Sequence, residues 1–175
     1  MASRIKKALI ECGALRYGDF TLASGKKSPY YVDIKKASTD PHVLEIIADE
    51  MARLIHTECI KLDRIAGVVL GSIPLAAALS LRTKIPFVMV RKEKKDHGTA
   101  NLIEGALLKD EEVLMIEDVI TSAGSVSEAI ESVRSAGGRV SATLCVVDRQ
   151  EGGEERLAKM GVKLVSLVTA EELLK

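Results

Sequence analysis

Near-continuous apolar runs alternate with helix-forming segments over the last two thirds of the chain. The runs cover residues 65–70, 86–90, 113–116, 140–147 and 162–168. Strands of a parallel sheet have this pattern, because helices cover both of their faces. Segments with helical patterns lie between the runs, among them residues 74–81 and 125–136. This alternation predicts an α/β fold with a central, mostly parallel sheet flanked by helices.

The N-terminal part has a different pattern. Residues 3–12 place apolar side chains on one helical face, and Gly13 follows as a stop signal. Residues 20–34 contain two short extended stretches. Asp40 followed by Pro41 predicts the start of a second helix, since aspartate caps helices and proline is tolerated in the first turn.

Composition and charge mainly indicate which partners and locations are not expected. Lys plus Arg and Asp plus Glu both number 25, so the formal net charge is zero. Nucleic acids and membrane surfaces attract proteins with a basic excess, so neither is expected as a partner. No apolar run approaches the length of a membrane span, and three scattered cysteines suit a reducing, cytoplasmic location. Without a linker or an internal repeat, residues 1–175 are expected to form one domain.

The most informative stretch follows the apolar run at residues 113–116. Glu117 and Asp118 come directly after the run, and a turn rich in small and hydroxyl residues leads into a helix. Backbone N–H groups at a helix N-terminus bind phosphate, and carboxylates accept hydrogen bonds from ribose hydroxyls. This combination predicts a sugar-phosphate site. The alternative is an ordinary capped helix, for which Ser125 and Glu128 have the capping-box spacing.

A second polar segment follows the run at residues 86–90. Residues 91–98 contain four cations and a histidine in a chain that has no net charge. Most such runs are only solvated loops. This one stands at the end of a predicted strand, where open parallel sheets bind their ligands. A multiply charged ligand such as a diphosphate is therefore the functional interpretation.

Residues 113–125 closely resemble the phosphoribosyl diphosphate-binding motif of the type I phosphoribosyltransferases. The shared pattern is four apolar residues, two acidic residues, two variable residues and a turn rich in Thr, Gly and Ser. The resemblance implies the fold of that family, with a small N-terminal hood of about residues 1–40 and a core of about residues 41–175. It assigns phosphoribosyl diphosphate binding to Glu117, Asp118, Val119, Ile120, Thr121, Ser122, Ala123, Gly124 and Ser125.

Residues 91–98 resemble the catalytic loop of the orotate phosphoribosyltransferases, and residues 99–105 continue it as a long flexible loop. The loop's pattern is matched by Arg91, Lys92, Lys95 and His97. The resemblance implies that these side chains bind phosphoribosyl diphosphate. Residues 148–151 match the family's Asp-Arg-Gln-Glu, whose arginine, here Arg149, binds the orotate carboxylate. Thr121 is implied to contact orotate as well.

The chain departs from the family at three positions. Ala23 replaces a lysine, Leu75 stands where some members carry a lysine in a diphosphate-binding loop, and Ala123 lies where glycine is frequent. Tyr30 and Tyr31 belong to the N-terminal motif, and in an extended strand only one of them can face the base. The short N-terminus and the two absent lysines resemble a compact, archaeal-type subgroup.

The implied reaction transfers phosphoribosyl from phosphoribosyl diphosphate to orotate, giving orotidine 5′-phosphate on the route to UMP. Lys95 and Asp118 are the implied catalytic residues. Mg²⁺ is the implied cofactor, held mainly by the substrate and not by direct protein ligands. The resemblance also implies a homodimer whose basic loop serves the neighbouring subunit. Two alternatives stay open: a phosphoribosyltransferase for another base, and a non-catalytic regulator that senses phosphoribosyl diphosphate.

Overall fold

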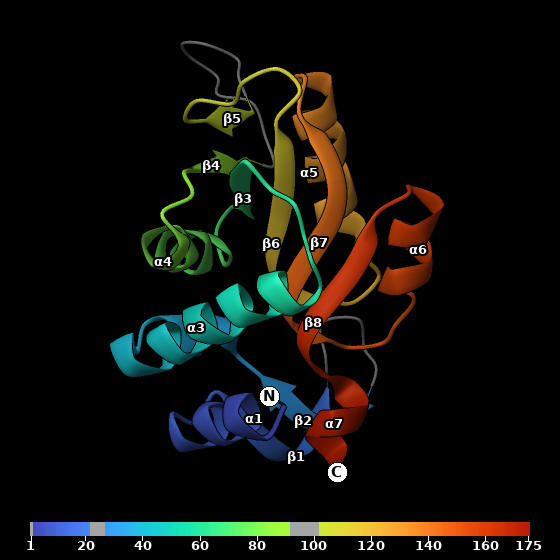
Figure 1. Ribbon diagram of the computed structural model, residues 1–175. Helices are drawn as coiled ribbons and strands as arrows, with labels where there is room; N and C mark the ends of the chain where they lie inside the picture. The colour runs from blue at the N-terminus through green and yellow to red at the C-terminus, as the bar shows by residue number, and fades with distance from the viewer. Residues whose placement is uncertain (1, 22–26, 92–101) are drawn as a thin grey trace.

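The computed structural model describes residues 2–21, 27–91 and 102–175 (Figure 1). Its helices are α1 Ala2–Glu11, α2 Ile34–Ser38, α3 Pro41–Thr57, α4 Ile73–Thr83, α5 Gly124–Ser135, α6 Gly153–Lys159 and α7 Ala170–Leu174. Its strands are β1 Leu15–Thr21, β2 Lys27–Val32, β3 Arg64–Val68, β4 Phe87–Val90, β5 Ile103–Glu104, β6 Glu112–Ile120, β7 Arg139–Asp148 and β8 Lys163–Thr169.

The central sheet has the strand order β5-β4-β3-β6-β7-β8 within the described ranges. The strands β4, β3, β6, β7 and β8 pair in parallel, and the short edge strand β5 is antiparallel to β4. The α/β fold with a mostly parallel sheet, predicted from the alternating runs, is confirmed. Parallel strands need crossover connections, and helices provide most of them here.

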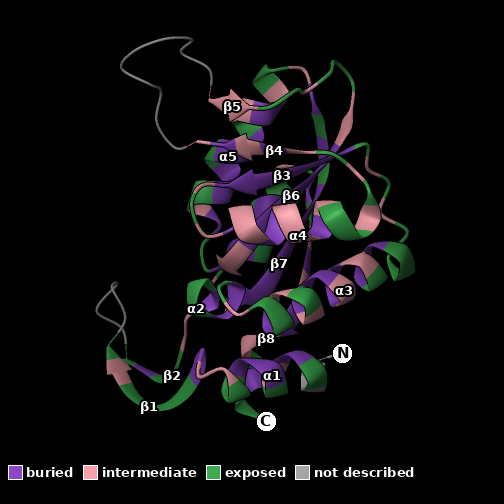
Figure 2. Cartoon of the chain, turned by 90° about the vertical axis from the view of Figure 1, so that its left-hand side faces the viewer, coloured by how far each residue is buried: buried purple, intermediate pink, exposed green. Residues whose placement is uncertain are grey.

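Two hydrophobic layers lie on opposite faces of this sheet. Leu114 and Ile116 of β6 pack into the layer that contains α1, α3 and α4. Val113 and Met115 pack into the layer that contains α5 and α6. Successive side chains of a strand point to opposite faces, so both sets are buried and the sequence reads as one apolar run. Figure 2 shows this burial along the central strands.

An antiparallel hairpin of β1 and β2 forms a separate two-stranded sheet beside the core. The hairpin is joined to the other end of the chain, since the Tyr17 hydroxyl donates a hydrogen bond to the Leu173 carbonyl at 2.6 Å. Both termini lie near this hairpin in Figure 1.

Both predicted N-terminal helices are present. α1 ends before Gly13, whose φ of +70° is the left-handed conformation expected of a helix stop. The Asp40 carboxylate caps α3 by accepting hydrogen bonds from the N–H groups of His42 and Val43. No helix within the described ranges is both long enough and apolar enough to cross a membrane.

Some element boundaries differ from the predictions. The strand expected over residues 113–116 continues to Ile120, because β6 pairs with β7 as far as Ile120 opposite Asp148. Glu117 and Asp118 are therefore strand residues and not the start of a loop. The elements α2, β5, α6 and α7 had no counterpart in the sequence prediction, and all are short.

Candidate functional site

The strand order creates a crevice at the carboxyl ends of β3 and β6. These two strands are neighbours, and the chain continues from β3 to β4 on one side and from β6 to β7 on the other. The loops that follow them lead to α4 and α5, which cover opposite faces of the sheet. Open parallel sheets bind ligands at such a switch point. Here it lies between residues 69–72 and residues 121–123.

The two carboxylates of β6 stand at this crevice with different partners. Glu117 is buried, and its Oε2 accepts a hydrogen bond from the hydroxyl of the fully buried Ser72. Asp118 accepts a hydrogen bond from the Val119 N–H at 2.8 Å. Its Oδ2 lies 3.7 Å from Nζ of Lys35. Both acids predicted to face the ribose are thus held at the site by groups from three elements or loops.

Gly71 fits beside Asp118 only because it has no side chain. A Cβ atom at this position would lie 2.2 Å from Oδ2 and 2.8 Å from Cγ of Asp118. The loop after β3 therefore packs its backbone directly against the carboxylate of β6. This contact brings the loop after β3 and the acidic pair of β6 together at the crevice.

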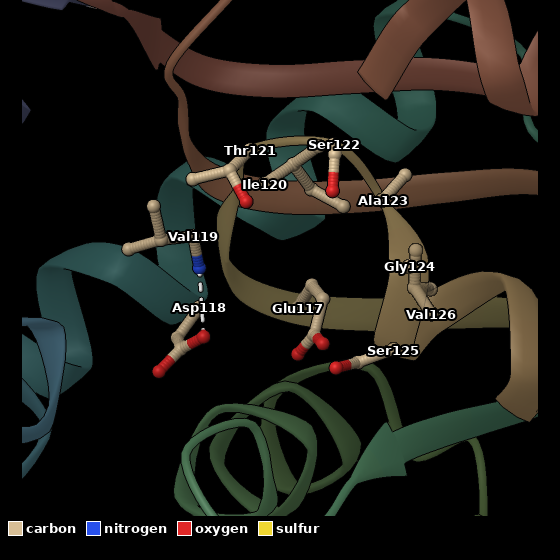
Figure 3. A pocket seen from close by; sticks show the side chains of 10 residues that line it. All are labelled: Glu117, Asp118, Val119, Ile120, Thr121, Ser122, Ala123, Gly124, Ser125 and Val126. Carbon is tan, nitrogen blue, oxygen red and sulfur yellow. Dashed lines mark hydrogen bonds between the residues drawn. The ribbon is translucent and has the colours of Figure 1, made fainter. Parts of the chain in front are cut away.

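The turn after β6 encloses a small polar pocket. The lining residues are continuous in sequence, from Glu117 to Val126. Figure 3 shows the hydroxyls of Thr121, Ser122 and Ser125 on the same side of the turn as the two carboxylates. Hydroxyl donors and carboxylate acceptors around one space suit a ribose phosphate, which presents both hydroxyls and anionic oxygens.

The capping-box prediction for α5 is wrong. The helix begins at Gly124, so Ser125 lies inside the first turn, and the N-cap residue is Ala123 with no side-chain capping bond. The first N–H groups of α5 therefore have no side-chain cap, and an anion can bind them. Ala123 has a φ of +58°. That conformation explains why glycine is frequent at this position and costs alanine about 1 kcal/mol.

The segment after β7 supports this turn from behind. A Cβ atom on Gly153 would lie 2.4 Å from Cγ2 of Ile120 and 2.7 Å from the carbonyl oxygen of Thr121. The N–H of Arg149 also donates to the Ile120 carbonyl at 2.9 Å. The turn is thus held by close backbone packing against residues that are distant in sequence.

Arg149 is largely buried, with 10% of its side chain exposed. Its Nε donates to Glu151 at 2.9 Å, Nη2 lies 3.4 Å from the Ser28 hydroxyl, and the guanidinium carbon lies 4.8 Å from the centre of the Tyr30 ring. Nη1 has no hydrogen-bond partner among the described residues. The terminal Nη edge of the guanidinium therefore has donors left for a ligand carboxylate.

These contacts show which of Tyr30 and Tyr31 faces Arg149. Tyr30 is buried under Arg149, and burial raises the pKa of its hydroxyl. Tyr31 lies on the other face of β2, with its ring centre 5.7 Å from that of Phe20. Tyr30 is therefore the tyrosine on the Arg149 side of the hairpin.

The predicted basic loop is described only at its ends. Arg91 follows β4, and its Nη1 lies 3.4 Å from Oε1 of Glu104. Lys92, Lys95 and His97 lie outside the described residues, as does Ala23. Residues 103–104 form the strand β5, so the last part of the loop expected over residues 99–105 is an ordered antiparallel edge.

The structure also shows the surroundings of Leu75, which stands where some family members carry a lysine, and of a lysine near the acidic pair. Leu75 is buried in the core on α4, so its side chain is a packing residue. Lys35 brings a cation to Asp118 from α2, which the sequence analysis missed. The available signal was Asp33, which caps α2 by accepting a hydrogen bond from the Lys36 N–H. An acidic cap before a five-residue helix is too short a pattern to stand out.

Comparison with known proteins agrees with this geometry. A family model described as a phosphoribosyl transferase domain matches residues 37–171. The fold and the site thus define a phosphoribosyltransferase.

More specific relatives extend the match over almost the whole chain. The orotate phosphoribosyltransferase of Methanosarcina mazei is 54% identical over 168 residues, which cover 96% of this chain and 89% of the relative. The crystal structure of orotate phosphoribosyltransferase from Aeropyrum pernix matches with a TM-score of 0.87 and 37% identity, covering 97% of this chain and 96% of that one. The Mycobacterium tuberculosis orotate phosphoribosyltransferase in complex with 5-phospho-α-D-ribosyl 1-diphosphate matches with a TM-score of 0.81 and 27% identity, covering 99% of each chain. This chain belongs to the orotate phosphoribosyltransferases.

Proposed function

We propose that the protein joins orotate to the ribose of phosphoribosyl diphosphate, releasing diphosphate and giving orotidine 5′-phosphate. The observation that carries this proposal is the placement of three groups at one crevice. The acidic pair on β6 lines the pocket of the turn before α5. Arg149 donates its backbone N–H to the Ile120 carbonyl just before that turn, and its guanidinium lies against Ser28 and Tyr30 of the hairpin. Ribose, phosphate and a carboxylated base each have complementary groups there.

The residues of the turn bind the phosphoribosyl part of the substrate. The N–H groups from Thr121 to Ser125 and the hydroxyls of Ser122 and Ser125 bind the 5′-phosphate, helped by the dipole of α5. Glu117 and Asp118 accept hydrogen bonds from the ribose hydroxyls. As the bond to diphosphate breaks, positive charge develops on the ribose ring, and fixed carboxylates stabilise it. Asp118 is the preferred candidate for stabilising this positive charge, because Glu117 already accepts a hydrogen bond from Ser72.

Cations of the loop after β4 stabilise the leaving diphosphate. Arg91, Lys92 and Lys95 are the proposed cations, and His97 is proposed as a further hydrogen-bond donor. The charge of the three cations offsets the negative charge that grows on the leaving group, and Lys95 is proposed as the catalytic member. The Thr121 hydroxyl and Arg149 bind orotate on the opposite side of the anomeric carbon.

The oxygen donors of the site fit Mg²⁺ as a substrate-held cofactor. Mg²⁺ prefers six oxygen ligands. Glu117 and Asp118 supply hard oxygens, and the described residues contain no cluster of three His, Cys, Asp or Glu side chains placed to hold a metal. Diphosphate and ribose oxygens are the proposed main ligands. When bound, the ion neutralises charge on the diphosphate.

Orotate consumption is expected only when phosphoribosyl diphosphate and a divalent metal are both present. A spectrophotometric assay of orotate loss tests this, with uracil, adenine and hypoxanthine as control bases. Excess chelator should abolish turnover, and added Mg²⁺ should restore it. Full activity in chelator contradicts the metal requirement. Turnover of a control base without orotate turnover contradicts the proposed substrate.

The β1–β2 hairpin is proposed to act as the hood of the site within one domain of residues 1–175, because Ser28 and Tyr30 of β2 contact Arg149. A cytoplasmic location is proposed as well. All three cysteines are free, as suits a reducing compartment.

A homodimer is the proposed assembly. A surface groove between α3 and α4 is lined by Leu44, Ala48, Ala78 and Leu81 together with charged residues. Leu81 is 72% exposed, and large apolar side chains at such a surface favour contact with a second copy. The basic loop is proposed to serve the partner's site.

Mixing two inactive variants, Lys95→Ala and Asp118→Asn, is expected to restore activity. If the loop acts across the dimer, one site of each mixed dimer contains both lesions and the other contains none. Random exchange then gives about a quarter of wild-type activity. Activity measured after verified subunit exchange tests this. A mixture that stays inactive despite exchange shows that each loop serves its own subunit.

A further inference from the structure

Arg156 is a cation beside the turn that precedes α5. The family resemblance gives it no role. It lies on α6, whose first residue, Gly153, packs directly against the carbonyl of Thr121. Nη1 of Arg156 lies 3.9 Å from the position that a Cβ atom would take on Gly124. The Ser122 hydroxyl lies 4.0 Å from the same point. The guanidinium therefore stands at the first residue of α5.

This guanidinium has no hydrogen bond or ion pair among the described residues. The other arginines near the site differ in this respect, since Arg149 is paired with Glu151 and Arg91 with Glu104. Arg156 is exposed on a seven-residue helix whose first turn contains Glu154 and Glu155, yet neither carboxylate is within ion-pair distance. Its side chain is free to bind an anion at the turn.

The turn itself contains only neutral donors. Thr121, Ser122 and Ser125 offer hydroxyls, and the backbone offers N–H groups, while Glu117 and Asp118 place negative charge on the same pocket. A phosphate monoester has close to two negative charges at neutral pH. A cation on α6 offsets the repulsion from those carboxylates. Arginine is suited to this, because its planar fork binds two phosphate oxygens at once.

We propose that Arg156 binds the 5′-phosphate of phosphoribosyl diphosphate and is a specificity residue for that end of the substrate. This inference rests on the proposed function, because it places a phosphoribosyl group in the turn. Arg156 has no role in the leaving of diphosphate, which is bound on the other side of the ribose. Its effect therefore falls on substrate binding.

Calorimetric titration with ribose 5-phosphate and, separately, with inorganic diphosphate tests this assignment. Arg156→Ala should weaken ribose 5-phosphate binding about tenfold, as expected for loss of one charge-assisted contact, and leave diphosphate binding unchanged. Arg156→Lys should retain part of the affinity. Lys159→Ala is the matched control, because it removes one positive charge from the same helix. That control should change neither titration.

Steady-state kinetics should show the same division. The KM for phosphoribosyl diphosphate rises in Arg156→Ala, whereas kcat and the KM for orotate stay close to wild type. Equal losses in Arg156→Ala and Lys159→Ala, an unchanged ribose 5-phosphate affinity, or a matching loss of diphosphate affinity each overturn the inference. A wild-type protein that neither binds ribose 5-phosphate nor consumes orotate overturns the proposed function as well.

Discussion

Replacing Gly71 with alanine is expected to lower kcat/KM about 100-fold without unfolding the protein. Gly71 has no positive φ, so its backbone accepts alanine without strain. The new Cβ would stand 2.2 Å from Oδ2 of Asp118, and the carboxylate must rotate away from it. A catalytic group displaced by about 1 Å has effects of this size. Activity assays and thermal unfolding of Gly71→Ala measure the two parts of this expectation.

A double-mutant cycle shows whether Gly71 acts through Asp118. If alanine at position 71 harms activity only by moving the carboxylate, Gly71→Ala combined with Asp118→Ala should be no worse than Asp118→Ala alone. Losses that simply add, or an unchanged activity of Gly71→Ala, contradict this account. A protein that unfolds at much lower temperature points instead to a structural role of the glycine.

Replacing Arg149 with alanine is expected to raise the KM for orotate about 30-fold, which corresponds to about 2 kcal/mol for one charge-assisted bidentate pair. The guanidinium is oriented by Glu151, Ser28 and Tyr30, and its Nη edge has donors left for the ligand. The KM for phosphoribosyl diphosphate should change little, because that substrate is proposed to bind through β6 and its turn. Arg149→Lys keeps the charge without the planar fork and should recover only part of the loss.

Arg139 offers a matched control at the other end of β7. It is an arginine in surface ion pairs with Asp110 and Glu112, far from the crevice along the strand. Arg139→Ala should leave both KM values unchanged. If Arg149→Ala raises the two KM values equally, its role is to support the site in general and not to recognise the orotate carboxylate.

The local pattern of the sequence determined the class of fold and the position of the proposed phosphate site. The apolar runs predicted the parallel strands, because a strand that is buried on both faces has apolar residues at almost every position. Asp40 predicted the start of α3, because a cap acts within one turn of helix. The segment from Glu117 to Ser125 predicted a phosphate and ribose site, since its chemistry is contained in consecutive residues.

The start of α5 was not predicted correctly from the local sequence. Ser125 and Glu128 have that spacing, but Ala123 adopts a left-handed conformation and α5 begins one residue before Ser125. Gly153 of α6 packs closely against Thr121 in this turn. No local pattern contains that contact.

Only the tertiary structure decided which distant groups meet at the site. Gly71 meets Asp118 because β3 and β6 are neighbours although β4 and β5 lie between them in the chain. Tyr30 meets Arg149 because the hairpin folds over the end of β7, and Arg156 reaches Gly124 because α6 packs behind the turn. The spacing of apolar residues in the sequence indicates which face of a helix or strand is buried. The order of strands in the sheet decides which elements become neighbours.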